Sequence, residues 1–169
     1  YKTVADNQRK LVPVALEHDE TGWQCDMAKL ESALACPENK ILLLCSPHNP
    51  TGKVWTREEL NEMAMLCERH QVKVISDEIH MDMVWSRQQH TPWHQVARGP
   101  WALFTSASKS FNIPALTGAY GFIADETDRN LYLAALKNRD GLSSPAVLSL
   151  VAHIAAYQEG ATWLDALRG

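Results

Sequence analysis

Short apolar runs alternate with amphipathic stretches along the chain. Runs rich in β-branched and large apolar side chains are typical of strands. Five of them are LVPVAL (11–16), ILLLC (41–45), VKVIS (72–76), WALFTS (101–106) and AYGFIA (119–124). We expect a polar turn at 17–23 after the first run. We also expect ILLLC to be buried on both faces, because an uninterrupted apolar run is typical of the interior of a parallel sheet.

Between these runs, apolar residues recur at helical spacing, which predicts four helices. The first begins after Asp26, a residue type that caps helices well. The second begins at Thr56, which has Glu59 three residues later and so matches a capping box. Its expected buried stripe is Leu60, Met63, Ala64 and Cys67. The third spans 126–138, and the last begins near Pro145.

The order of strands and helices predicts an α/β fold with a largely parallel sheet. We see no internal repeat, low-complexity tract or domain linker. Ligands of open α/β sheets bind beyond the carboxyl ends of the strands. The polar residues that follow each strand are therefore the first candidates for a functional site.

Composition and charge exclude several classes of partner. The formal net charge is −4 and basic residues do not cluster, which argues against nucleic acid and anionic membranes. No apolar run has the ~18 residues of a membrane span. The four cysteines match no metal-binding spacing, and neither do the histidines of 80–95. We expect reduced structural thiols, no metal site and a cytoplasmic protein.

Three polar side chains follow three of the predicted strands. Asn49 lies in SPHNPTGK after ILLLC, Asp77 begins DEIH after VKVIS, and Lys109 lies in ASKSFN after WALFTS. Each has an ordinary structural explanation: a turn asparagine before proline, a helix-capping aspartate and a solvated lysine. Together they are expected to gather at one edge of one sheet.

A lysine, an aspartate and an asparagine around one cleft suit pyridoxal phosphate. Lys109 would form the Schiff base with the aldehyde and then move the proton on the substrate Cα. Asp77 would pair with the pyridine nitrogen and keep the ring an electron sink. Asn49 would donate a hydrogen bond to the phenolic oxygen of the ring, and His80 could do the same.

Two small residues shortly precede this lysine. Ser106 and Ser108 would leave room for the amine and offer hydroxyl groups to the phosphate. A nucleotide-binding loop in NPTGK is the competing interpretation, but it fails. The Walker pattern needs an earlier glycine and a Ser or Thr after the lysine, whereas Pro47 and Val54 occupy those positions.

Three segments together resemble a known family: SPHNPTGKVWT, VISDEIHMD and SASKSFNIPALTGAYG. They are similar to the fold-type-I pyridoxal-phosphate enzymes, the aminotransferase class I/II superfamily. Within it, SDEIHMDMVW and SKSFNIPAL resemble the MalY/PatB/cystalysin-type carbon–sulfur β-lyases. The resemblance implies a three-layer α/β/α large domain and pyridoxal 5′-phosphate as cofactor. It also implies the roles given above for Lys109, Asp77 and Asn49, and a phosphate contact for Ser106.

The activity implied by the resemblance is α,β-elimination. An L-cysteine thioether such as cystathionine would be cleaved to a thiol, pyruvate and ammonia. Many aminotransferases have Tyr where His80 stands here, and an Arg near the position of Thr117; these departures fit the lyase branch better. An amino-acid aminotransferase stays open as an alternative. So does a regulatory role, since this branch is associated with restraint of the maltose-regulon activator.

The resemblance also bears on completeness. Members of the superfamily are roughly twice as long or more, so we expect residues 1–169 to be part of a large domain without the small domain. The run at 119–124 would then lie at a sheet edge. Full-length members are homodimers, and we expect the isolated chain to be inactive and to bind the cofactor weakly, if at all.

Overall fold

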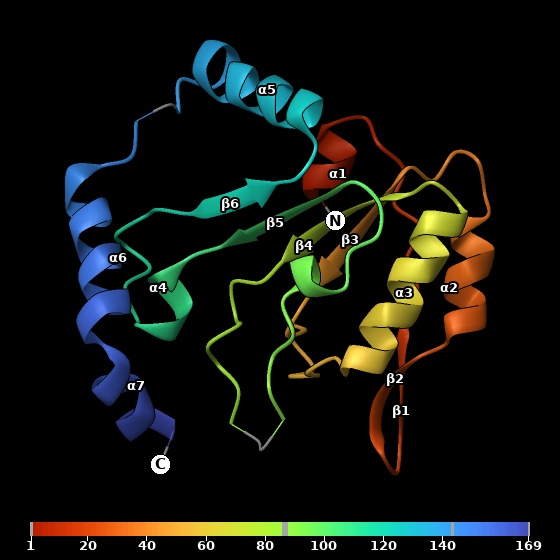
Figure 1. Ribbon diagram of the computed structural model, residues 1–169, viewed down its shortest axis with the longest axis horizontal. Coiled ribbons are helices and arrows are strands. Elements are labelled where there is room, and N and C mark those ends of the chain that lie inside the picture. The colour runs from red at the N-terminus through yellow and green to blue at the C-terminus, as the bar shows by residue number, and fades with distance from the viewer. Residues whose placement is uncertain (1, 86–87, 143, 169) are drawn as a thin grey trace.

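The centre of the protein is a four-stranded sheet with the order β3-β4-β5-β6 (Figure 1). The computed structural model describes residues 2–85, 88–142 and 144–168. The strands are β3 (Ile41–Cys45), β4 (Lys73–Asp77), β5 (Trp101–Thr105) and β6 (Tyr120–Ile123). The first three are mutually parallel, and β6 pairs with β5 in the antiparallel direction. The predicted α/β class with a mostly parallel sheet is confirmed, and β6 lies at the sheet edge as expected.

The four predicted helices are confirmed, with small shifts at their ends. They are α2 (Met27–Leu34), α3 (Arg57–Arg69), α5 (Glu126–Ala134) and α6 (Val147–Glu159). A π-helical turn, η2 (Ala135–Arg139), continues α5. The sequence interpretation missed the other helices: α1 (Lys2–Asp6), η1 (Trp93–Gln95), α4 (Ala107–Ser110) and α7 (Ala161–Arg168). Within the described ranges, no helix combines the length and the apolar character that crossing a bilayer requires.

The strand predicted at 11–16 is wrong. Residues 11–15 form no strand, and a hairpin follows them, with β1 (Leu16–Asp19) antiparallel to β2 (Gly22–Cys25). Its strands include most of the residues expected in the turn at 17–23, and only 20 and 21 lie between them. At its tip, Gly22 has a φ of 114°, and the Asp19 carboxylate accepts a hydrogen bond from the Thr21 amide at 2.7 Å. The turn residues therefore determine the structure of this segment. An apolar run forms a strand only when a neighbouring strand completes its backbone hydrogen bonds.

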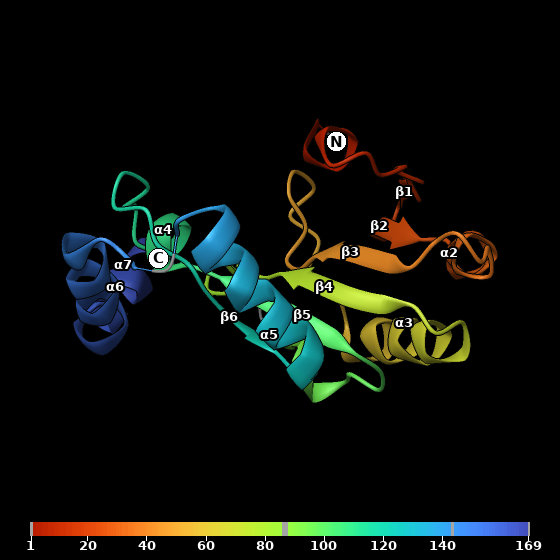
Figure 2. The same cartoon turned by 90° about the horizontal axis from the view of Figure 1, so that it is seen from above.

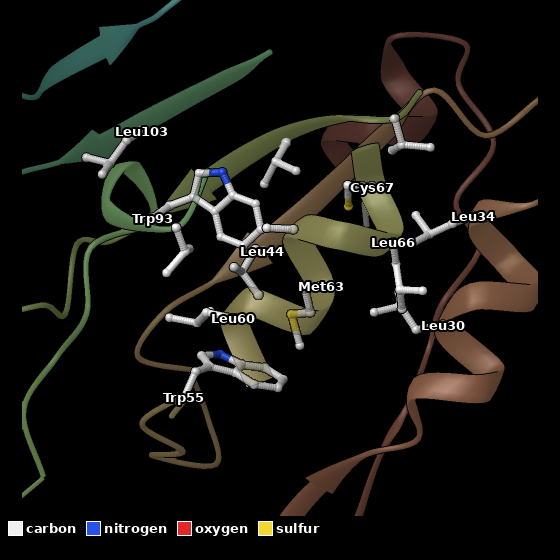
Figure 3. Close-up of a cluster of buried hydrophobic side chains, with 14 residues drawn as sticks. Leu30, Leu34, Leu44, Trp55, Leu60, Met63, Leu66, Cys67, Trp93 and Leu103 are labelled. Carbon is white, nitrogen blue, oxygen red and sulfur yellow. The ribbon is translucent and has the colours of Figure 1, made fainter. Parts of the chain in front are cut away.

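One face of the sheet packs against α3 to form the hydrophobic core (Figure 3). The expected stripe is buried here. The main contributors are Leu44, Val74 and Leu103 from the sheet, Leu60, Met63, Ala64 and Cys67 from α3, and the indoles of Trp55 and Trp93. The helix begins with the predicted capping box. The Thr56 hydroxyl accepts from the Glu59 amide at 3.1 Å, and the Glu59 carboxylate accepts from the Thr56 amide at 2.8 Å.

Replacing Thr56 by alanine is expected to lower the free energy of unfolding by about 1 kcal/mol, because it leaves the Glu59 amide without its acceptor. Urea titration of the full-length protein measures the change. Thr127→Ala is the matched control, since Thr127 lies inside the first turn of α5 while Asp125 provides that cap. The two variants should differ clearly; equal losses would mean that the Thr56 cap contributes nothing specific.

The other face of the sheet is only partly covered by the described residues. Side chains alternate along β5, so Leu103 faces the core while Phe104 contacts Tyr132 of α5, with ring centroids 5.5 Å apart. On β3 the corresponding positions are open: Ile41 is 53% exposed and Leu43 is 55% exposed. The prediction that ILLLC is buried on both faces is therefore wrong in this structure, because α3 covers only one of them.

Two pairs of helices lie at opposite ends of the molecule. α2 and α3 flank one end, while α6 and α7 lie at the opposite end, beyond the last residues of the parallel strands (Figure 2). The short helix α4 lies between β5 and α6 (Figure 1). The carboxyl ends of the strands therefore face a region bounded by α4 and α6, which is where a site was expected.

Candidate active site

The carboxyl ends of β3, β4 and β5 lie side by side. In the register of the sheet, Cys45 is level with Asp77, and Asp77 is level with Phe104. Two hydrogen bonds extend this alignment beyond the strand ends. The Ser46 amide donates to the Asp77 carbonyl (2.9 Å), and the Glu78 amide donates to the Phe104 carbonyl (2.8 Å). The expectation that the three polar segments begin at one edge of one sheet is confirmed.

A hollow with a volume of about 480 Å³ opens at this edge. Its lining residues come from β3, β4 and β5, from the residues just after β4 and β5, and from the residue just before β6: Leu43, Leu44, Cys45, Ile75, Asp77, Ile79, Phe104, Thr105, Ser106 and Ala119. Two of the predicted site residues, Asp77 and Ser106, therefore line the same hollow. Apolar side chains and one aromatic ring make up most of the remainder, which suits a flat, partly apolar ligand with a few polar groups.

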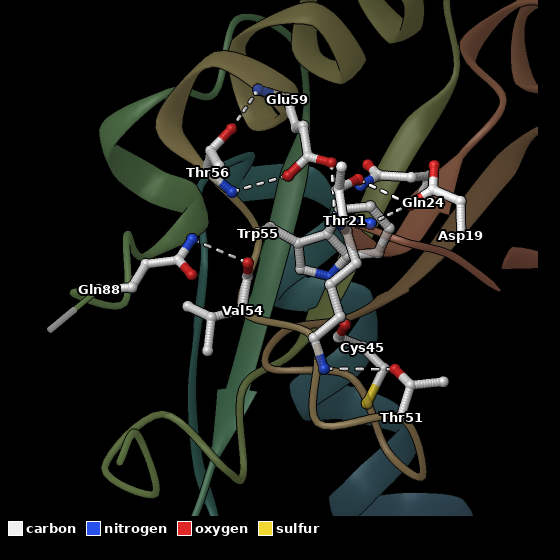
Figure 4. A network of polar contacts seen from close by, with 11 residues as sticks. Asp19, Thr21, Gln24, Cys45, Thr51, Val54, Trp55, Thr56, Glu59 and Gln88 are labelled. Carbon is white, nitrogen blue, oxygen red and sulfur yellow. Dashed lines mark hydrogen bonds and ion pairs between the residues drawn. The ribbon is translucent and has the colours of Figure 1, made fainter. Parts of the chain in front are cut away.

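The loop that carries Asn49 is held in place by several contacts (Figure 4). The Trp55 indole donates to the Cys45 carbonyl at 2.9 Å, and the Lys53 ammonium pairs with the Glu59 carboxylate at 2.7 Å. Within the loop, the His48 amide donates to the Lys53 carbonyl at 2.8 Å. Asn49 itself is exposed and does not line the hollow, but its amide donates to the Cys45 sulfur at 3.4 Å. Asn49 therefore contacts a residue of the lining, Cys45, without lining the hollow itself.

Two adjacent carboxylates at the end of β4 point in opposite directions. Asp77 lines the hollow, and its Oδ1 atom accepts a hydrogen bond from the Ile79 amide at 3.1 Å. Glu78 is 0% exposed and accepts from the Ser76 hydroxyl (2.9 Å), the Trp93 amide (2.8 Å) and His90 Nε2 (2.8 Å). The alternation of side chains along an extended segment explains the difference. Asp77 is available to a ligand, and Glu78 is used by the fold.

Lys109 lies on the short helix α4, which is fixed at both of its ends. Ser106 is the N-cap, and its hydroxyl accepts from the Ser108 amide at 3.1 Å. At the other end, the Phe111 ring contacts Tyr157 of α6 and stacks on Trp163 of α7, with centroids 5.5 and 6.0 Å apart. Lys109 therefore projects from a well-anchored turn.

The remaining predicted residues lie beside the hollow rather than in its lining. Lys109 is exposed and Ser108 is half-buried on α4. His80 is half-buried, and its Nδ1 atom is buried without a hydrogen-bond partner among the described residues. The structure therefore brings Asp77 and Ser106 together, and it places Asn49, Lys109, Ser108 and His80 on the segments that border them.

The sequence interpretation missed two residues that organise this site. Glu78 fastens the end of β4 to the segment at 90–93, and alternation in VISDEIH was the signal that separated it from Asp77. His153 of α6 contacts the Ser106 hydroxyl with its Nε2 atom at 3.1 Å. No local pattern pointed to His153, because 47 residues separate it from Ser106.

Cys45 reports on the environment of the hollow. Burial raises the pKa of its thiol above the usual value of 9.0; the Asn49 amide opposes this shift, and the Asp77 carboxylate adds to it. The thiol form is therefore dominant at neutral pH, since the lining disfavours the thiolate. Cys45 therefore lines the hollow as a thiol of low nucleophilicity.

Comparison with known proteins identifies the family. The profile of the family described as aminotransferase class I and II matches residues 1–168. The chain belongs to this family. Family membership agrees with the α/β fold and with a site at the carboxyl edge of the sheet.

Individual members of the aminotransferase class I and II family resemble the chain along its whole length. It is 70% identical over 168 residues to the protein MalY of Escherichia coli strain K12, covering 99% of the chain and 43% of that protein. It is 34% identical over 170 residues to the cystathionine beta-lyase PatB of Bacillus subtilis strain 168, covering 99% and 44%. The PLP-bound C-S lyase of Staphylococcus hominis superposes with a TM-score of 0.91 at 28% identity, covering 99% and 42%. The chain thus spans less than half the length of these relatives.

Proposed function

We propose that the full-length protein is a pyridoxal-phosphate-dependent carbon–sulfur β-lyase that cleaves L-cysteine thioethers. The observation that carries the proposal is the shared hollow: Asp77 and Ser106 line it, and the helix that begins at Ser106 carries Lys109. The names of PatB and of the Staphylococcus hominis enzyme support the reaction class, and the 70% identity to MalY supports the branch.

The residues present fit the cofactor. A carboxylate on the wall suits a ring nitrogen, and Asp77 keeps acceptor capacity beyond its bond to the Ile79 amide. A hydroxyl on the same wall, from Ser106, suits a phosphate. Leu43, Ile75 and Phe104 provide apolar surface for the flat ring between them. This chemistry of the lining is what supports pyridoxal phosphate over other ligands.

The roles of the residues follow from their chemistry. When bound, pyridoxal phosphate supplies an electron sink for the pair of electrons left at the substrate Cα. Asp77 holds the ring nitrogen in its protonated form, and Asn49 donates to the ring oxygen. Lys109 supplies the amine that removes the Cα proton, and general-base catalysis of this kind contributes about 10²–10⁴ in rate. Ser106 and Ser108 bind the phosphate, and His80 is a second donor to the ring oxygen.

The test compares two reactions of the full-length protein. A lyase releases pyruvate, ammonia and a thiol from L-cystathionine with no second substrate. An aminotransferase produces no pyruvate from cystathionine but converts an added keto acid into its amino acid. Release of pyruvate in the absence of a keto acid is the expected result. Amino-group transfer without elimination would overturn the proposed reaction in favour of the aminotransferase.

Cys45 offers a test of occupancy that does not depend on turnover. Because Cys45 lines the hollow, pyridoxal 5′-phosphate is expected to protect it from iodoacetamide. The unprotected rate should rise with pH up to and beyond the usual thiol pKa of 9.0, since burial shifts the pKa of Cys45 upward. Peptide mass spectrometry measures both effects. Cys36, beside Glu38 and away from the lining, is the internal control; equal protection of both cysteines would contradict occupancy of the hollow.

Three further features stay predictions for the full-length protein. They are a homodimeric state, a cytoplasmic location and contact with the maltose-regulon activator. Sedimentation analysis tests the first, fractionation tests the second, and a pull-down with the purified activator tests the third. Weak cofactor binding by the isolated residues 1–169 also stays a prediction, and a stable yellow form of that chain would contradict it.

A further inference from the structure

Lys53, at the end of the NPTGK segment, carries a charge that is almost buried. Its side chain is 9% exposed, and its ammonium pairs with the Glu59 carboxylate at 2.7 Å. The ammonium also lies 5.0 Å from the ring centroid of Trp55, within the range of a cation–π contact. Three other lysines of the described residues pair with carboxylates, but their side chains are 49% to 86% exposed. The Lys53 pair is therefore an interior contact, where the loss of one partner has a large effect.

Glu59 connects this ion pair to the start of helix α3. Its Oε1 atom binds the Lys53 ammonium, and its Oε2 atom accepts a hydrogen bond from the Thr56 amide at 2.8 Å (Figure 4). Since α3 packs on the sheet through the hydrophobic core, Lys53 is bound to one of the firmly packed elements of the protein.

Lys53 also closes the loop that carries Asn49. The His48 amide donates to the Lys53 carbonyl, and the Gly52 amide donates to the His48 carbonyl, both at 2.8 Å. Among the described residues, no hydrogen bond holds the side-chain amide of Asn49, whose backbone amide contacts the Cys45 sulfur at 3.4 Å. The direction of the Asn49 side chain therefore depends on the backbone of the loop that Lys53 closes.

We propose that Lys53 is a positioning residue for Asn49. Its pair with Glu59 fixes the end of the loop against α3, and the loop directs the Asn49 amide toward the ring oxygen of the cofactor. A buried ion pair contributes little net stability compared with apolar side chains of similar size, but it favours the arrangement of the loop in which both charges are paired. Lys53 acts through Asn49, and the inference rests on the proposed function, to which the Asn49 contact belongs.

Two ligands measure the Asn49 contact in the full-length protein. They are pyridoxamine 5′-phosphate and its 3-deoxy analogue, which lacks the ring hydroxyl. Neither has the aldehyde, so neither bonds to Lys109. The wild type is expected to prefer the ligand with the hydroxyl about tenfold, because a hydrogen bond to a charged oxygen is one of the stronger kinds. Asn49→Ala should bind the two ligands about equally. Isothermal titration calorimetry measures the affinities.

Two variants break the ion pair from its two sides. Lys53→Met removes the charge and keeps an unbranched apolar side chain over Trp55. The preference is expected to fall to about twofold or less, while the affinity for the deoxy analogue stays nearly unchanged. Glu59→Gln should have the same effect, because it removes the counter-charge while its amide oxygen can still accept from the Thr56 amide. Combining Lys53→Met with Asn49→Ala should change the preference no further than Asn49→Ala alone, as for two residues that act on one contact.

Thr56→Ala is the matched control. It removes the hydroxyl that caps α3 at the same corner of the structure, but it leaves the pair between Lys53 and Glu59 in place. It should therefore lower the free energy of unfolding and keep the preference for the ring hydroxyl. A purely structural role of Lys53 would give the same result for Lys53→Met as for Thr56→Ala.

The outcomes separate this role from the proposed function. If the ion-pair variants keep the wild-type preference, or weaken both ligands equally, the role of Lys53 is overturned and the proposed function stands. Glu59→Gln alone decides this point if Lys53→Met does not fold. If the wild type binds both ligands equally, the proposed contact of Asn49 fails, and the role of Lys53 fails with it. If the wild type binds neither ligand, the proposed function fails as a whole.

Discussion

Replacing Lys109 by alanine is expected to reduce the release of pyruvate from cystathionine at least about a thousandfold in the full-length protein. The change removes the amine that moves the Cα proton, and no other side chain in the described residues offers an amine on α4. Lys109→Arg should be equally inactive, because a guanidinium stays protonated and cannot act as a base. A coupled pyruvate assay measures the rates.

The loss is expected to be chemical rather than structural. Lys109 is exposed, so its truncation leaves the packing of Ala107 and Ser110 in place, and the free energy of unfolding should change by less than about 0.5 kcal/mol. Ethylamine added to Lys109→Ala should restore part of the rate by supplying the missing base. Lys137→Ala, in the exposed π-helical turn η2, should keep wild-type turnover. Undiminished activity of Lys109→Ala would eliminate the proposed mechanism.

The sequence was sufficient to predict which edge of the sheet carries the candidate site, because that prediction needed only strand polarity. Three apolar runs could be recognised as parallel strands, and parallel strands bring their carboxyl ends to the same edge. Asn49, Asp77 and Lys109 follow those ends directly, and the register of β3, β4 and β5 confirms the alignment of their segments. Local patterns of this kind can be recognised in the sequence without knowledge of the tertiary structure.

The parts that could not be predicted depend on contacts between distant segments. LVPVAL has the composition of a strand, but whether a run becomes a strand depends on a neighbour to pair with, and composition carries no such information. Burial of β3 on both faces depends on which helices cover it. His153 and Ser106 meet only because α6 returns to the end of β5. Side-chain roles at the site therefore needed the fold, whereas the position of the site did not.

Replacing Glu78 by alanine is expected to lower the free energy of unfolding by about 3–5 kcal/mol, the largest stability effect among these variants. The carboxylate is fully buried and accepts from Ser76, Trp93 and His90. Its removal leaves three donors unsatisfied and opens a cavity beside the backbone amide of Trp93. Urea titration followed by tryptophan fluorescence measures the change.

Glu78→Gln separates the hydrogen bonds from the charge. The amide oxygen can still accept from the Ser76 hydroxyl and the Trp93 amide, and the loss is expected to shrink to about 1–2 kcal/mol. Glu68→Ala is the surface control, because its contact with Arg98 is 3.7 Å long and exposed on both sides; it should cost less than about 1 kcal/mol. Glu78→Ala should also weaken cofactor binding, since Glu78 fixes the strand end from which Asp77 faces the hollow. If Glu78→Ala is as stable as Glu68→Ala, the buried carboxylate does not anchor the end of β4.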